Sequence, residues 1–226
     1  MPEAYSFHPK KRSIFGSFSV NATLIFINLA VFIVFLILLV FFKDNPEILY
    51  DYLALKPSNI LNGDYLWTFI TSMFMHANLF HIFANMLSLF FIGTLVERII
   101  GPKRYFYFYM ISGLFAGAFF VLSSLIFTAD LNTFAVGASG ALFGLVGLLV
   151  LLTPNLPVYV MFIPIPVKMK YAGPGILVVL WLISVFGDIP IGNTAHFGGL
   201  IVGIVYGIYL RRRYRKKTKY LSRYFS

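Results

Sequence analysis

Residues 20–42 read VNATLIFINLAVFIVFLILLVFF, an unbroken run of 23 residues without a charged side chain. At ~1.5 Å per helical residue, this run is long enough to cross a hydrocarbon layer of ~30 Å. It is longer than the ~7–15-residue apolar region of a secretory signal, and no small-residue cleavage site follows it. We therefore expect it to be retained as a first membrane span.

The composition of the whole chain extends this prediction. Its 226 residues are 59% hydrophobic and only 12% charged, which is more apolar surface than a soluble domain of this size can bury. There is no cysteine, so disulfides and thiolate chemistry are excluded. The sequence predicts an all-α membrane protein, a bundle of six transmembrane helices over residues 20–210 with tails at 1–19 and 211–226. The later spans are expected at about 79–96, 105–127, 140–153, 174–187 and 194–210.

The basic residues predict the orientation of these spans. If the N-terminus is cytoplasmic, only Lys43 and Lys56 of the 18 Lys and Arg residues fall outside the cytoplasm. The positive-inside rule thus favours a multi-pass protein of the cell membrane with both termini cytoplasmic. Residues 211–217, RRRYRKK, are best explained as a stop-transfer anchor attracted to anionic lipid. The lipid bilayer, and not nucleic acid, is therefore the expected partner of this run.

Residues 137–144, GASGALFG, place Ser139 between glycines where a polar loop becomes an apolar helix. Free backbone N–H groups at a helix N-terminus can stabilise a developing negative charge, although Gly and Ser also line ordinary contacts between membrane helices. The helix at 140–153 spans only ~21 Å, less than the ~30 Å hydrocarbon core. Ser139 is therefore expected below the extracytoplasmic surface, in a water-filled cavity.

Several polar side chains share this end of the predicted bundle. His76, His81 and His196 fall at the same outer ends of spans as Ser139. His81 and Asn85 are four residues apart, so they project from one helix face. Polar residues within a bilayer are costly and are candidates for function, although a single one can also be a simple helix–helix hydrogen bond.

Glycine spacing predicts how the serine and a histidine could meet. Gly199 and Gly203 follow His196 on one helix face, and the fourth helix offers Gly140 and Gly144. Glycine ridges let two helix backbones approach closely, which could bring Ser139 and His196 within the ~2.6–3.2 Å needed for proton transfer.

The acidic residues do not complete a metal site or a triad. There is no His-Glu-x-x-His motif, and Glu97 lies at the cytoplasmic end of its span, far from the histidines. Asp130 and Asp188 are on the right side but look like surface-loop residues. We therefore expect a serine–histidine dyad without metal or cofactor.

These motifs, taken in order, resemble those of the rhomboid intramembrane serine proteases. The resemblance covers residues 20–210 and rests on HANLFHIFAN at 76–85, Glu97-Arg98, GASG at 137–140, and AHFGG at 195–199 followed by Gly203. It implies that Ser139 is the nucleophile and His196 the general base. It also implies an oxyanion site formed by His81, Asn85 and the Ser139 backbone N–H, with His76 nearby. Substrates would be single-span membrane proteins cut in or near the membrane.

Two positions depart from the family pattern. Thr68 follows Trp67 where the family often has arginine, which leaves the anchoring of the first loop open. Phe143 stands where many bacterial members have a tyrosine that stacks on the catalytic histidine, and stacking does not require the hydroxyl.

Two other functions compete with the protease. A catalytically inactive rhomboid-like protein that binds transmembrane helices is one, and the intact Ser139 and His196 argue against it. A small transporter would predict paired intramembrane charges or inverted repeats, and the sequence has neither. The sequence specifies neither a substrate nor an oligomeric state.

Overall fold

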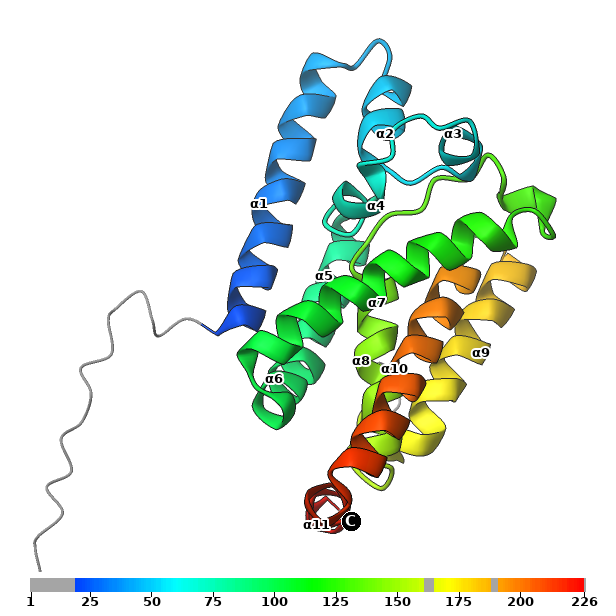
Figure 1. Ribbon diagram of the computed structural model, residues 1–226. Helices are drawn as coiled ribbons and strands as arrows, with labels where there is room; N and C mark the ends of the chain where they lie inside the picture. Colours follow the sequence, from blue (N-terminus) through cyan, green and yellow to red (C-terminus); the bar gives the residue numbers. More distant parts are fainter. Residues whose placement is uncertain (1–18, 161–164, 188–190, 226) are drawn as a thin grey trace, which may run out of the picture.

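The structure is a computed structural model that describes residues 19–160, 165–187 and 191–225. Residues 1–18 of the expected N-terminal tail therefore lie outside the described residues, and so does Asp188. Five helical segments are long and apolar enough to cross a membrane (Figure 1). They are α1 (Val20–Phe41), the rod Leu79–Ile100, α7 (Pro102–Ser123), α9 (Met169–Gly187) and α10 (Asn193–Arg213). The rod consists of α5 (Leu79–Ser88), the π-helical turn η2 (Leu89–Gly93) and α6 (Thr94–Ile100). With the shorter α8, they confirm a multi-pass helical bundle.

The short helix α8 (Ser139–Leu152) forms the centre of this bundle. It has 14 residues, and every side chain from Ala141 to Leu149 is buried. Its main neighbours are α10 and α7, with α9 along another side (Figure 1). A helix enclosed by protein needs no polar face, which explains why its sequence is apolar all round. Ser139, its first residue, is consequently placed inside the bundle.

The connection between α1 and the rod, where the sequence predicted no span, contains three short helices. They are α2 (Glu47–Leu53), α3 (Pro57–Leu61) and α4 (Thr68–Thr71). Leu55 and Ala135 exchange backbone hydrogen bonds of 3.0 and 2.8 Å, which ties this connection to the segment leading into Ser139. The Trp67 indole donates to the Tyr52 carbonyl at 2.9 Å, so it is anchored without a following arginine.

The predicted bounds of two membrane spans, those of α9 and α7, were wrong. Helix α9 begins at Met169, five residues before the expected start, and contains Pro174. The Met169 amide donates to the Leu156 carbonyl at 2.9 Å and the Lys170 amide to the Pro154 carbonyl at 3.0 Å, so the early helix start leaves these donors satisfied. Two antiparallel strands of two residues each, β1 (Pro157–Val158) and β2 (Val167–Lys168), precede this helix.

Helix α7 also starts and ends before its expected bounds of 105 and 127. Gly101 adopts a positive φ of 84°, and Pro102 occupies the first helical turn, where its missing N–H costs nothing. The basic tail after α10 forms a further helix, α11 (Arg215–Tyr224), which the sequence analysis did not predict.

Glu97 forms a buried polar connection that the sequence did not predict. Its carboxylate accepts the backbone N–H groups of Val20 and Asn21 at 2.8 and 3.1 Å, capping the N-terminus of α1. The Asn21 side chain donates to the Leu89 carbonyl at 2.8 Å and accepts from the Tyr105 hydroxyl at 2.6 Å. These bonds fasten one end of α1 to the rod and to α7.

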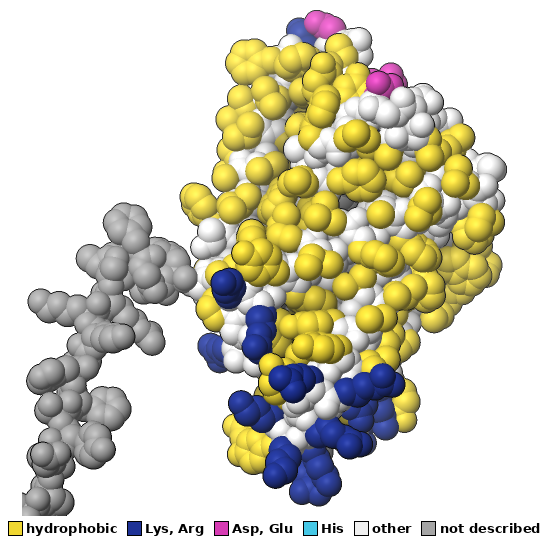
Figure 2. Space-filling view, viewed as in Figure 1, with side chains coloured by type: hydrophobic (Ala, Val, Ile, Leu, Met, Phe, Trp, Pro, Cys, Tyr) yellow, Lys and Arg dark blue, Asp and Glu magenta, His cyan; other side chains and the backbone are white. Residues whose placement is uncertain are grey.

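Charges separate to the two ends of the molecule. Figure 2 shows Lys and Arg side chains gathered around the end where α10 meets α11, and acidic side chains at the opposite end near the α1–α2 connection. A belt of apolar side chains lies between them. This distribution is consistent with the orientation that the positive-inside rule predicts.

Candidate active site

Ser139 and His196 meet although they are 57 residues apart in the sequence. His196 Nε2 lies 2.7 Å from Ser139 Oγ, within hydrogen-bonding distance. Ser139 is the first residue of α8, and His196 is in the first turn of α10. The histidine is buried with 7% of its surface exposed, whereas the serine is half-buried. The two predicted partners are thus close enough for direct proton transfer.

The imidazole of His196 has an aromatic neighbour on its face and no hydrogen-bond partner at Nδ1 among the described residues. Phe143, one turn after Ser139 on α8, stacks on the imidazole with a centroid distance of 4.7 Å and an interplanar angle of 24°. Nδ1 of His196 has no hydrogen-bond partner among the described residues. Within the part of the chain that the structure describes, the site is therefore a pair, and an aromatic ring takes the place of an orienting acid.

Backbone contact between α8 and α10 explains how the pair comes together. A Cβ on Gly199 would collide with the Gly140 carbonyl, and one on Gly203 would collide with the Gly144 carbonyl and lie 2.7 Å from the Leu148 nitrogen. Real Cβ atoms do not approach backbone atoms so closely, so both positions require glycine. The predicted close approach of these two helices is present.

The two glycines of α8 lie in the predicted contact with α10 and also pack against α7. A Cβ on Gly140 would lie 2.7 Å from the Ala116 side chain, and one on Gly144 would lie 2.5 Å from that of Ser112. Both partners belong to α7, whereas the carbonyls of Gly140 and Gly144 face α10, and a Cβ on Gly144 would also lie 3.5 Å from the Gly199 carbonyl of α10. Gly147, which the motif analysis passed over, is a further α8 position in this contact, since its Cβ would lie 2.5 Å from the Leu200 carbonyl of α10.

The polar pair of α5 lies against the backbone just before Ser139. Gly137 has a φ of 115°, and a Cβ there would lie 2.7 Å from His81 Nε2 and 3.7 Å from Asn85 Nδ2. The Gly137 amide donates to the Ser72 carbonyl at 2.8 Å, which holds this turn in place. Asn85 Nδ2 donates to the His81 carbonyl at 2.9 Å, and an amide carries a second N–H for another acceptor.

His76 packs beside this pair. It is fully buried, and its ring meets the ring of His81 edge-on at 5.1 Å and 70°. Burial, together with the neighbouring His81, lowers the pKa of His76 to about 4, so the ring is neutral at pH 7. The structure thus places His76 against His81, where it supports the ring that lies near Gly137.

No three His, Asp or Glu side chains gather as metal ligands anywhere in the described residues. The side chains present in this site are a serine hydroxyl, an imidazole that can accept its proton, and His81 and Asn85, which can donate N–H groups. These are the components of nucleophilic catalysis with a stabilised oxyanion.

Fold and site together define a multi-pass helical membrane protein with a serine–histidine pair enclosed in its bundle. Comparison with known families gives a match to the Rhomboid domain over residues 63–213, which is more than half of the chain. This chain belongs to the rhomboid family.

Individual relatives include both a protease and a protein named as inactive. RHOMBOID-like protein 1 of Arabidopsis thaliana is 38% identical over 159 residues, covering 68% of this chain and 37% of that protein. Rhomboid protease GluP of Bacillus subtilis (strain 168) is 29% identical over 193 residues, covering 84% and 35%. Inactive RHOMBOID-like protein 8 of Arabidopsis thaliana is 32% identical over 139 residues, covering 60% and 36%. The chain spans well under half the length of these relatives.

Proposed function

We propose that this chain is an intramembrane serine endopeptidase that cuts membrane-protein substrates with Ser139 and His196. The observation that carries the proposal is the 2.7 Å contact between His196 Nε2 and Ser139 Oγ inside a membrane bundle. A lone polar residue would be explained by helix packing. A hydroxyl paired with an imidazole, with N–H donors close by, fits nucleophilic catalysis better.

His196 acts as general base and then as general acid. Nε2 takes the proton of Ser139 as Oγ attacks the substrate carbonyl. The carbonyl oxygen becomes negatively charged and accepts hydrogen bonds donated by N–H groups of His81, Asn85 and the Ser139 backbone. Collapse of this intermediate breaks the C–N bond, and the leaving amine takes the proton from His196. Water, activated by the same imidazole, then hydrolyses the acyl-enzyme.

The proposed substrates are single-span membrane proteins. A carbonyl in an intact helix is hydrogen-bonded and shielded, so a substrate helix has to unwind before Ser139 can attack it. In this proposal residues 20–210 carry the activity, both tails are cytoplasmic, and the site opens toward the extracytoplasmic side.

One alternative has a specific observation in its favour. Because one relative is named inactive, a rhomboid-like protein that binds transmembrane helices without cutting them is the second candidate. Both readings use the same bundle, and they differ in whether the pair reacts.

Incubation of the purified protein with a model single-span substrate tests the proposal. We expect two fragments from the wild type and none from His196→Ala, with both proteins equally folded by thermal unfolding. Binding of the substrate by the wild type without cleavage would favour the second candidate. Equal cleavage by His196→Ala would contradict the proposed mechanism.

A further inference from the structure

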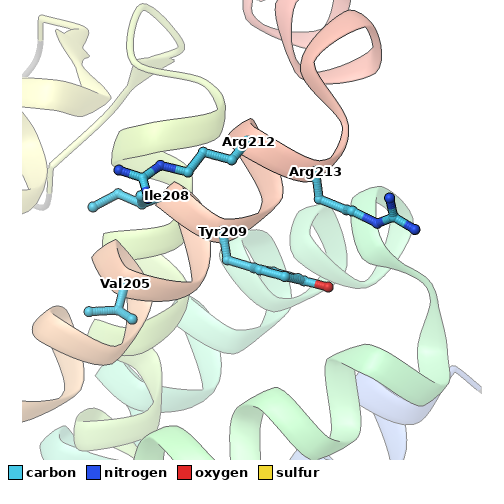
Figure 3. A pocket seen from close by; sticks show the side chains of 5 residues that line it. All are labelled: Val205, Ile208, Tyr209, Arg212 and Arg213. Carbon is cyan, nitrogen blue, oxygen red and sulfur yellow. The ribbon is translucent and has the colours of Figure 1, made fainter.

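The two ends of α10 differ in how much protein surrounds them. At the end remote from His196, one face of the helix borders a surface hollow of about 500 Å³, where Arg212 and Arg213 extend to opposite sides of the helix (Figure 3). Their guanidinium groups do not converge on one ligand. The first turn of α10 lies inside the bundle instead, with His196 buried and Ala195 set against a buried cluster of apolar side chains.

This cluster, here named the Leu55 cluster, is shared by the two segments that lead into the catalytic pair. Its fully buried members come from the connection between α2 and α3 and from α7, and they are Leu55, Phe120 and Val121. The partly buried side chains that pack against them are Ile60, Phe69, Ala135 and Ala195. Ala135 lies four residues before Ser139, and Ala195 directly precedes His196. One cluster therefore supports the approach to both members of the pair.

Leu55 also holds the segment before Ser139 through its backbone. Its amide and carbonyl both pair with those of Ala135, and the Ser58 amide, three residues on, donates to the Leu131 carbonyl at 2.9 Å. The run 131–138 passes beside α3 on its way to α8 (Figure 1). Leu55 thus fixes this run with backbone bonds, while its side chain fills the Leu55 cluster.

The side chain of Leu55 is tightly packed on the side of α7. A Cβ built on Gly117 of that helix would lie 3.1 Å from Leu55 Cδ2 and 3.2 Å from Phe69 Cδ1, closer than most real Cβ contacts. Protein interiors are close-packed, and the atoms around a deleted side chain relax only in part. A shorter residue at position 55 would therefore let the segments that carry Ala135 and Ala195 shift toward the vacated volume.

We propose that Leu55 is a positioning residue for Ser139 and His196, an inference that rests on the proposed proteolytic function. Along α10, the glycine contact at Gly199 holds the two helices on one side of the pair, and the Leu55 cluster holds the entering segments on the other side. Leu55 has no reacting group, so its effect is on geometry alone. Because ~1 Å of misplacement can cost on the order of 10² in rate, a small shift in this cluster slows the chemical step.

Kinetics of the detergent-solubilised full-length protein on a model single-span substrate test this role. The test variant is Leu55→Ala. The control is Leu24→Ala, which removes the same atoms from a leucine that is also 2% exposed but lies near the Glu97 end of α1. We expect similar losses of thermal stability in both. Only Leu55→Ala should lose kcat, by about 10- to 100-fold, with KM unchanged to within about twofold.

Two further measurements separate positioning from packing alone. Leu55→Met keeps the buried volume and should restore kcat, while Leu55→Val should fall between Leu55→Ala and the wild type. The rate at which a fluorophosphonate probe labels Ser139 should fall in parallel with kcat. This probe reports the reactivity of the serine without a substrate helix, so a defect in substrate docking would leave its rate unchanged.

Several outcomes would overturn the inference. One is wild-type kcat in a folded Leu55→Ala protein, or in Leu55→Val if the alanine variant does not fold. An equal loss of kcat in Leu24→Ala would show that any core cavity slows the enzyme. A raised KM with unchanged probe labelling would assign Leu55 to substrate docking. A wild-type protein that is neither labelled nor active would contradict the proposed function itself, and this inference with it.

Discussion

The ring of Phe143 stacks on the imidazole of His196 at 4.7 Å, while Ser139, one turn earlier on the same helix, contacts the Nε2 atom of that imidazole at 2.7 Å. Helix α8 therefore supplies both the partner of the histidine and the surface that fixes its plane. Among the described residues Nδ1 has no hydrogen-bond partner, so the stacking on Phe143 and the contact with Ser139 are the two observed interactions that constrain the ring.

Two replacements of Phe143 test whether turnover depends on the stacked ring or on the hydroxyl that a tyrosine would add. Phe143→Leu keeps most of the buried volume but removes the ring, so we expect turnover to fall about tenfold or more with only a modest loss of stability. Phe143→Tyr restores the residue of many family members and should retain turnover. The measurement is kcat on a model substrate beside thermal unfolding. Wild-type kcat in Phe143→Leu would show that stacking does not position His196.

Gly203 tests the approach of α8 and α10. An alanine Cβ would collide with the Gly144 carbonyl and Gly147, and backbone cannot yield as a flexible side chain does. We expect Gly203→Ala to cost ~1–3 kcal/mol of stability and, because ~1 Å of misplacement is enough, on the order of 10² in turnover. Gly175→Ala is the matched control, since a Cβ at that helical glycine has nothing within 4 Å. Equal turnover of the two variants would show that catalysis does not depend on the close contact of Gly203 with α8.

The arrangement of this site was largely predictable because membrane energetics restrict its residues. Polar side chains such as His81, Asn85 and His196 are costly in an apolar bundle, so their positions carried information. Glycines spaced along α10 likewise predicted a close helix contact. The short α8 followed from the distance between Ser139 and the prolines after Thr153.

Other features depend on contacts that no local pattern records. Gly140 and Gly144 pack against α7 as well as α10, and this second contact depends on the rotation of α8 about its axis, which spacing alone leaves undetermined. The role of Gly137 rests on a positive φ and on the approach of His81 from another helix. From the sequence, Glu97 was identified as an acid far from the histidines and as part of the Glu97-Arg98 motif, and not as a helix cap. Its bonds to the N-terminus of α1 join residues more than 70 positions apart.

Comparison of an Asn85 variant with an Asn78 variant tests whether Asn85 has a catalytic or a structural role. Asn85→Ala removes a proposed oxyanion donor, and we expect kcat to fall by roughly 10- to 100-fold, because His81 and a backbone N–H remain. The KM should change little. Asn78→Ala is the control, since its side chain caps α5 by accepting the His81 amide at 2.8 Å. That variant should lose about 1 kcal/mol of stability and keep kcat. The reverse pattern would mean that Asn85 only holds helices together.

The central claim, that Ser139 is a nucleophile activated by His196, is tested most directly by covalent labelling. The purified protein is treated with a fluorophosphonate probe, and the modified residue is located by peptide mass spectrometry. The account predicts labelling at Ser139 alone, much slower labelling of His196→Ala, and none of Ser139→Ala, with all three proteins equally stable to heating. Labelling of a different serine, or undiminished substrate cleavage by a folded Ser139→Ala protein, would contradict it.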